Sequence, residues 1–209
     1  MVSERYPSAS LYAEHCRDKA ARFHSILEMT GYDAIVVGSG SKKIQFQDDL
    51  TYPFVANPYF REWVPLGRRA GSFLSINAAS SKPILYLLTI EDIWHTSPQR
   101  LPDNYESCLE VIEYNCLDDL KNLLIKSDQS TVLINETNDL DVPLDCFNPK
   151  AVINSIDFQR RNKTDYEQAC IRMANKMAVP GHYAAEVAFR AGASELEIAS
   201  AYLSACNCA

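Results

Sequence analysis

Two adjacent carboxylates, Asp48 and Asp49, stand within an aromatic stretch of the chain and are its first candidates for chemistry. Paired carboxylates can bind a divalent cation or act as an acid and base couple. Neighbouring side chains on an extended segment point in opposite directions, however, and aspartate commonly caps a turn. The favoured interpretation is therefore that one of the two caps a local turn and the other faces solvent, while the cation or acid and base interpretation stays open.

One histidine, His182, has the spacing of a metal pair, because Glu186 lies four residues further along the same predicted helix. Glu186 also lies four residues before Arg190, and a solvated ion pair is the commoner outcome of that spacing. His15 and His24 fall on the first predicted helix, and we expect them to be surface or capping groups rather than ligands. None of these histidines predicts a metal site by itself.

Trp94 and His95 follow a predicted strand, and no Ser or Cys stands in a nucleophile-elbow motif that would make a triad with the histidine. For the tryptophan, packing is favoured over binding. Cys206 and Cys208 are closely spaced but lack the further Cys or His ligands that zinc needs. The sequence contains no GxGxxG, HExxH, CxxC or phosphate-binding GxxxxGK motif. We therefore expect no catalytic residue and no metal ligand in this chain.

The 209-residue chain has the composition of a globular protein, with 47% hydrophobic and 22% charged residues. Its net charge of -7 argues against a nucleic acid partner, because phosphate binding needs clustered Lys and Arg. No hydrophobic run is long enough to span a membrane, and the first residues lack the pattern of a secretory signal. Seven cysteines at irregular spacings are more typical of reduced thiols than of a disulfide framework. We expect a cytoplasmic protein without a membrane partner.

The elements that must position these residues begin with an α/β pattern. Ser10 is the expected N-cap of a helix whose hydrophobic residues recur every three or four positions up to Gly31. A second helix is expected at 117–125, and five hydrophobic runs predict strands at 33–38, 72–76, 83–88, 108–112 and 131–134. We expect the second and third strands to pair antiparallel, and the fourth and fifth to be parallel neighbours because a helix connects them. The pattern predicts a mixed sheet with helices over its faces.

From about residue 148 the pattern becomes helical. Pro149 is expected at a first helical position, and capping boxes at 164–167 and 194–197 begin two further helices. Pro180 lies inside the first of these two, where a proline costs about 3 kcal/mol, so we expect a kink or marginal stability.

The aromatic stretch at 45–65 carries a resemblance to a known family. Three prolines exclude a continuous helix there, and the aromatic residues are Phe46, Tyr52, Phe54, Tyr59, Phe60 and Trp63. The order QFxDDxxYPFxxNPxFxxWxP resembles the N-terminal domain of bacterial Xaa-Pro dipeptidases (prolidases), including the relatives known as organophosphorus acid anhydrolases. Further segments follow the order of that family, namely LYAEH at 11–15, KPIL at 82–85, WH at 94–95, NPKAV at 148–152, KTDYEQAC at 163–170 and SELEI at 194–198.

The resemblance implies a fold in two parts. Residues 1–160 would form the α/β creatinase/prolidase-type N-terminal domain, a mixed β-sheet flanked by helices. Residues 161–209 would be the first two helices of an α+β pita-bread metallopeptidase domain, which is incomplete because its sheet comes from later sequence. Without that sheet we expect the apolar face of these helices to be exposed, or buried against a second copy, at Ala178, Val187, Phe189, Ile198 and Leu203. The metal ligands of the family, two aspartates, a histidine and two glutamates, would also lie beyond Ala209. We therefore expect this chain to be inactive alone and to bind no cofactor, whereas the full-length enzyme would hold two Mn²⁺ ions.

The resemblance further implies a substrate and a partner. The full-length enzyme would cleave dipeptides with a C-terminal proline, and the N-terminal domain would build a homodimer and cover the mouth of the active site. Asp49 then has a third interpretation, in which it reaches across the dimer interface and lines the substrate pocket of the neighbouring subunit. Two alternatives stay open: a non-catalytic dimerisation or interaction module, and the N-terminal domain of an aminopeptidase P or creatinase-like enzyme. The order Tyr52-Pro-Phe and Asn57-Pro favours prolidase over the second alternative.

Overall fold

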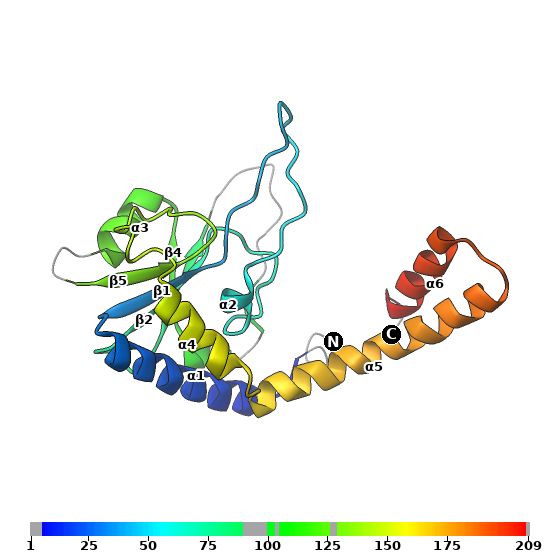
Figure 1. Ribbon diagram of the computed structural model, residues 1–209, viewed down its shortest axis with the longest axis horizontal. Helices are drawn as coiled ribbons and strands as arrows, with labels where there is room; N and C mark the ends of the chain where they lie inside the picture. Colours follow the sequence, from blue (N-terminus) through cyan, green and yellow to red (C-terminus); the bar gives the residue numbers. More distant parts are fainter. Residues whose placement is uncertain (1–5, 90–99, 103–104, 126–128, 208–209) are drawn as a thin grey trace. The chain divides into compact units, whose positions relative to one another are not determined.

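The computed structural model of the chain describes residues 6–89, 100–102, 105–125 and 129–207. The chain forms two compact units, residues 1–163 (unit 1) and 164–209 (unit 2). Unit 1 is built on a five-stranded sheet, and unit 2 holds the helices α5 (Asp165–Arg190) and α6 (Glu195–Asn207) (Figure 1). Within the described residues no helix is long and apolar enough to cross a membrane.

The sheet of unit 1 has the strand order β4-β3-β2-β1-β5. β2 is antiparallel to both β1 and β3, whereas the outer pairs β3–β4 and β1–β5 are parallel. The predictions of a mixed sheet and of an antiparallel second and third strand are therefore confirmed. The strands are β1 (Ala34–Gly38), β2 (Phe73–Asn77), β3 (Ile84–Leu88), β4 (Glu110–Tyr114) and β5 (Thr131–Ile134).

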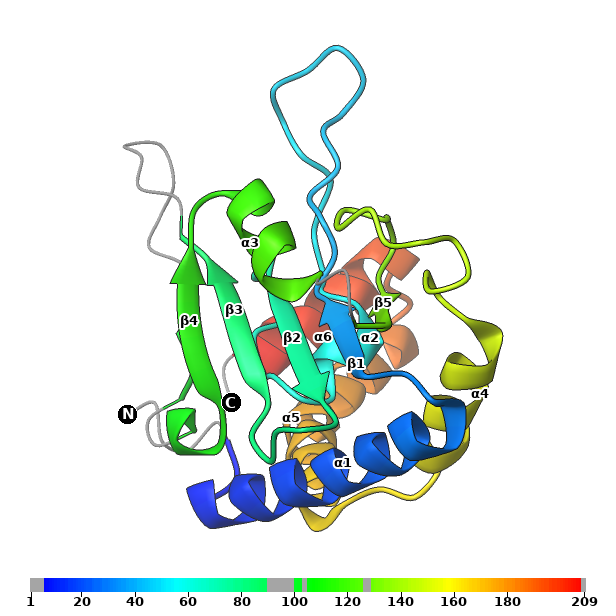
Figure 2. The same cartoon turned by 90° about the vertical axis from the view of Figure 1, so that its left-hand side faces the viewer.

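The prediction that the last two strands are neighbours is wrong. β4 lies beside β3 at one edge of the sheet, and β5 lies beside β1 at the other edge. Helix α3 (Leu117–Leu124) lies in the connection between them, in front of the sheet in Figure 2. A connecting helix makes two strands parallel, but the edge on which each strand adds depends on packing far along the chain. A short 3₁₀ helix, η2 (Glu106–Cys108), precedes β4, so this strand begins at Glu110 and not at residue 108.

Helix α1 (Ala9–Thr30) packs on β1, β2 and helix α4 (Lys150–Arg160). Its N-cap is Ser8, whose Oγ accepts from Leu11 N at 3.4 Å, so the expected cap Ser10 lies within the helix. The helix ends as predicted at Gly31, whose φ of 76° is the left-handed conformation that glycine adopts at little cost. The predicted apolar stripe is buried, at Tyr12, Cys16, Ala20, Phe23 and Leu27.

The other face of the sheet is covered by α3 and by the segment at 140–147. Alternate strand residues reach opposite faces, and β1 is buried on both, which accounts for its unbroken hydrophobic run. This second core brings strand residues together with two leucines of α3. Its members are Val36, Phe73, Tyr86, Leu120, Leu124, Leu133, Leu140, Val142 and Cys146.

In unit 2, α5 and α6 pack closely against each other. A Cβ atom on Gly181 would lie 2.5 Å from Cys206 Sγ, so the glycine permits this approach. The capping box at Thr164 is confirmed: Glu167 N donates to Thr164 Oγ1 at 3.3 Å, and Thr164 N donates to Glu167 Oε2 at 2.9 Å. At Ser194 the backbone N and the hydroxyl both donate to Glu197 Oε2, at 2.8 and 2.7 Å.

Helix α5 continues through Pro180 as one element, so this proline does not end it. Pro149 is the N-cap of α4 and not its first helical residue. Of the side chains expected on an uncovered face, Val187, Phe189 and Leu203 are exposed, whereas Ala178 and Ile198 are half-buried.

Candidate functional site

The aromatic stretch consists of two different parts in the structure. Residues 41–55 form an exposed hairpin, which we call the arm, and residues 56–66 form a buried anchor (Figure 1). Phe46 in the arm is 89% exposed and Leu50 is 61% exposed, whereas Phe60 and Trp63 in the anchor are buried. The sequence alone did not predict this division, because aromatic residues occur in both parts.

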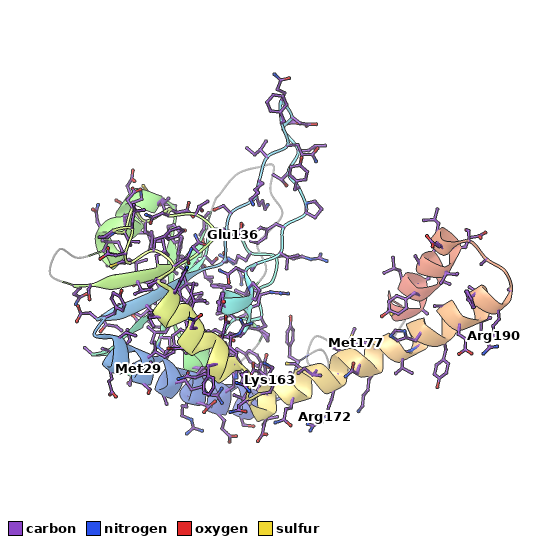
Figure 3. All side chains as sticks on the ribbon, in the orientation of Figure 1. Met29, Glu136, Lys163, Arg172, Met177 and Arg190 are labelled. Atoms are coloured by element: carbon purple, nitrogen blue, oxygen red, sulfur yellow. The ribbon has the colours of Figure 1, made fainter. Side chains whose placement is uncertain are left out.

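A few backbone hydrogen bonds hold the two strands of the arm together. Tyr52 N donates to Lys43 O and Gln45 N donates to Leu50 O, both at 2.9 Å. At the base of the arm, Lys43 Nζ lies 3.7 Å from an oxygen of Glu136, which is labelled in Figure 3. Figure 3 also shows the side chains of the arm extending away from the body of unit 1. The arm therefore presents apolar side chains to solvent beyond its own domain.

Asp48 and Asp49 lie at the tip of the arm and have different environments. Asp48 Oδ1 accepts a hydrogen bond from Leu50 N at 2.9 Å, and this bond holds the pKa of the Asp48 carboxyl below its ordinary value. Asp49 is exposed. The interpretation in which one aspartate caps the turn and the other faces solvent is confirmed. The role of Asp49 in the substrate pocket of a neighbouring subunit stays a prediction.

Asn57, near the start of the anchor, connects the anchor to the end of β1. Asn57 Oδ1 caps the short helix α2 (Pro58–Arg61) by accepting from Tyr59 N at 2.7 Å, and Asn57 Nδ2 donates to Gly38 O at 2.8 Å. Trp63 then packs edge-on against Phe23 of α1, with 5.1 Å between the ring centroids. These contacts fix the base of the arm to the sheet and to α1.

A buried polar cluster completes the anchor. Glu62 Oε2 lies 3.2 Å from Lys19 Nζ on α1 and 2.8 Å from Arg160 Nε on α4. A ring nitrogen of His15 lies 2.7 Å from Glu62 O, at the C-cap of α2. His15 is buried, so the expectation that it could lie at the surface is wrong, and it acts as a capping group inside the domain. The arm is therefore carried by a rigid base that α1 and α4 both support.

The two residues with the spacing of a metal pair, His182 and Glu186, have other partners, and so does His24. Glu186 accepts from Arg190, which is labelled in Figure 3, at 2.9 Å, and His182 packs edge-on against Tyr202 at 5.1 Å between centroids. A ring nitrogen of His24 lies 3.2 Å from Asn77 O. Within the part of the chain that the structure describes, no group of three or more His, Cys, Asp or Glu residues could hold a metal ion. Trp94, His95 and Cys208 lie outside the described residues.

The donor groups of the described residues thus do not fit a dinuclear metal centre. What the site offers is an exposed, apolar and aspartate-tipped arm on a rigid domain. This arrangement is suited to contact with another surface.

Comparisons with known proteins agree with this description. The family model for "Xaa-Pro dipeptidase, N-terminal domain" matches residues 10–158. The Xaa-Pro dipeptidase of Edwardsiella ictaluri is 38% identical over 202 residues, and that of Pseudoalteromonas atlantica is 36% identical over 199 residues. Each match covers 94% of this chain but 45% of the relative, so the chain spans less than half the length of these curated relatives.

Among solved structures, the low-pH form of aminopeptidase P from E. coli is similar to this chain with a TM-score of 0.50 and 16% sequence identity. The match covers 86% of this chain and 44% of that enzyme. At this identity the likeness bears on the fold alone, and it confirms a mixed sheet flanked by helices.

Proposed function

The chain belongs to the Xaa-Pro dipeptidase family through its N-terminal domain, and from this premise we propose that it is the N-terminal part of a dinuclear-metal hydrolase that cleaves dipeptides with a C-terminal proline. The observation that supports the proposal most strongly is the match over 94% of this chain to relatives of which it covers 45%. In this proposal the two metal ions, Mn²⁺ in the family, are held by sequence that the relatives carry outside the matched region.

We place the boundary between the two domains at about residue 160. Residues 1–160 are the N-terminal domain, and residues 161–209 supply the first two helices of the pita-bread domain. The side chains that remain exposed on α5 and α6, among them Val187 and Phe189, support this division, because an amphipathic helix pair of this kind needs a further surface.

The role that we propose for the arm is dimerisation and cover of the active site. An exposed hairpin with Phe46, Leu50 and Tyr52 at the surface can bury these side chains in a second copy of the chain. Asp49 stands at its tip, in a position from which a carboxylate could enter the substrate pocket of the neighbouring subunit. The buried anchor supports this role, because it gives the arm a fixed base.

The first test measures peptidase activity. The 209-residue chain with Mn²⁺ should not cleave Gly-Pro, whereas a chimera in which residues 1–209 are followed by the remaining part of the Edwardsiella ictaluri relative should cleave it. Asp49→Asn in the chimera should lower kcat/KM, and the matched variant Asp48→Asn should not, because asparagine still accepts the hydrogen bond of Leu50. Cleavage by the chain alone, or a folded chimera that leaves Gly-Pro intact, would contradict the proposal.

The second test measures the oligomeric state by size-exclusion chromatography with light scattering. The chain should elute as a dimer, and the double variant Phe46→Ser, Leu50→Ser should elute as a monomer. Leu144→Ser is the control, because Leu144 is 85% exposed but lies outside the arm. A chain that is monomeric at every concentration, or a dimer that survives the loss of both arm residues, argues against dimerisation through the arm.

A second candidate function is a free-standing interaction module that binds itself or a complete prolidase. The exposed arm favours it, because its apolar side chains can be covered by another protein surface. Mixing the 209-residue chain with a complete relative distinguishes the two: an interaction module forms a mixed complex, and a chain that remains apart from the complete enzyme does not act in this way.

A further inference from the structure

A cavity in unit 1 brings together two thiols that are far apart in the sequence. It has a volume of about 460 Å³ and lies between α1, the turn at 81–83 and η2. Cys16 of α1 and Cys108 of η2 both line it. Helix α1 and η2 pack against each other, and the Cys108 side chain lies close enough to interact electrostatically with the Cys16 thiol. The arm and its anchor do not line this cavity, so it is separate from the proposed dipeptidase role.

We propose that Cys16 and Cys108 are a thiol-modification site that low-molecular-weight disulfides oxidise to an intramolecular disulfide. Two thiols that line one cavity, on two helices that pack against each other, can approach the S–S bonding distance of about 2.05 Å by side-chain movement. Both are free in the structure, as are Cys116, Cys146, Cys170 and Cys206. Cys16 and Cys108 are the two of these six cysteines that line this cavity.

The two thiols differ in access, which sets the order of the reaction. Cys108 is half-buried at the end of η2, and its Sγ lies 3.6 Å from the Ser107 hydroxyl. Cys16 is buried, and this burial raises the pKa of its thiol to about 12, with a further contribution from the charge and hydrogen bond of Cys108. The accessible Cys108 therefore reacts first, and Cys16 reacts second and slowly.

The reaction balances in two exchange steps. Cys108 as thiolate attacks one sulfur of a disulfide RSSR, forming Cys108–S–SR and releasing RS⁻, which takes up the proton that Cys108 lost. Cys16 as thiolate then attacks the Cys108 sulfur of this mixed disulfide, forming the Cys16–Cys108 bond and releasing a second RSH. One RSSR is reduced to two RSH, and two protein thiols are oxidised to one disulfide.

The rim of the cavity favours an anionic disulfide. Arg17 and Lys82 both line the cavity and are exposed, so they place two positive charges near Cys108. Oxidised glutathione carries carboxylates that these charges attract, and the attraction weakens as salt is added. Hydroxyethyl disulfide has no charge and is the matched probe.

The test follows the native 209-residue chain with oxidised glutathione by peptide mass spectrometry. A glutathione adduct on Cys108 should form first and then give way to a linked Cys16–Cys108 peptide. In Cys16→Ala the adduct should persist without conversion, and Cys116→Ser, which removes an exposed thiol elsewhere, should leave the linkage unchanged. Lys82→Glu should slow adduct formation with oxidised glutathione but not with hydroxyethyl disulfide.

Three results would overturn the proposal. One is a Cys16 that stays reduced while Cys108 keeps its adduct to the end of the reaction in the unsubstituted chain. Another is modification of Cys116 or Cys170 with Cys108 left free. The third is a linked peptide that appears only after the chain is unfolded in urea. This result would show that the native arrangement of the two thiols does not permit the Cys16–Cys108 disulfide.

Discussion

Lys19 and Glu62 form an ion pair inside unit 1, with 3.2 Å between Lys19 Nζ and Glu62 Oε2 and with side chains 2% and 6% exposed. Lys19 belongs to α1, and Glu62 is the C-cap residue of α2 in the anchor. Arg160 of α4 adds a second cation at 2.8 Å from the same oxygen. The charge of Glu62 therefore joins the three helices on which the exposed arm depends.

Replacing Glu62 by Gln should destabilise unit 1 by about 3–5 kcal/mol, because the substitution leaves Lys19 charged and buried without its carboxylate. Urea unfolding followed by tryptophan fluorescence measures this loss, since Trp63 lies in the same unit.

The control is Glu136→Gln, which removes the ion pair with Lys43 in the same unit, where both side chains are exposed. Exposed pairs contribute about 0–1 kcal/mol. If the two variants lose the same free energy of unfolding, burial does not make the Lys19–Glu62 pair more important for stability than an exposed ion pair.

Gly38→Ala should destabilise the contact between β1 and the segment after β5. A Cβ atom at this position would lie 2.5 Å from Asn135 Cγ, so either the strand or the asparagine must move, at a cost of about 1–3 kcal/mol. Gly67→Ala is the matched control, because its Cβ would meet Arg61 Cδ at 3.6 Å, an ordinary contact. Thermal unfolding compares them, and equal melting temperatures would refute the steric argument.

Asp48 should titrate at a lower pH than an ordinary aspartate. Its pKa is depressed in the folded chain by the hydrogen bond from Leu50 N, so the bond contributes stability above the unfolded pKa and is lost as the pH falls through the folded pKa. NMR should show the Leu50 amide shift following this titration. In Asp48→Asn the acceptor remains but the titration should vanish; a Leu50 shift that still moves at the same pH would assign it to another group.

Thr164→Ala should weaken the start of α5 by about 1 kcal/mol, because Glu167 N loses its side-chain acceptor. Hydrogen exchange at the Glu167 amide should become faster, while Thr164→Ser, which keeps the hydroxyl, should leave it nearly unchanged. Equal exchange in both variants would mean that the capping box contributes nothing measurable.

Some of the candidate site could be predicted from the sequence. The turn-capping role of one aspartate at 48–49 follows from a local rule, since a carboxylate can accept from a backbone N–H two residues away. The Glu186–Arg190 pair follows from helical spacing in the same way. The cluster of Lys19, Glu62 and Arg160 could not be predicted, because its members come from three segments whose approach depends on the packed domain.

The sequence by itself determined the features that depend on neighbouring residues and on the order of motifs: the end of α1 at Gly31, the capping box at Thr164, the antiparallel pairing of β2 and β3, and the family. Tertiary structure decided that β4 and β5 occupy opposite edges of the sheet, that Phe60 is buried while Phe46 is exposed, and that Cys16 and Cys108 line one cavity. The physical reason is the distance along the sequence over which each interaction acts. Caps and turns are made by hydrogen bonds between residues a few positions apart. The edge on which a strand adds, the burial of a side chain and the approach of two distant cysteines are instead fixed by packing between segments that have no local pattern in common.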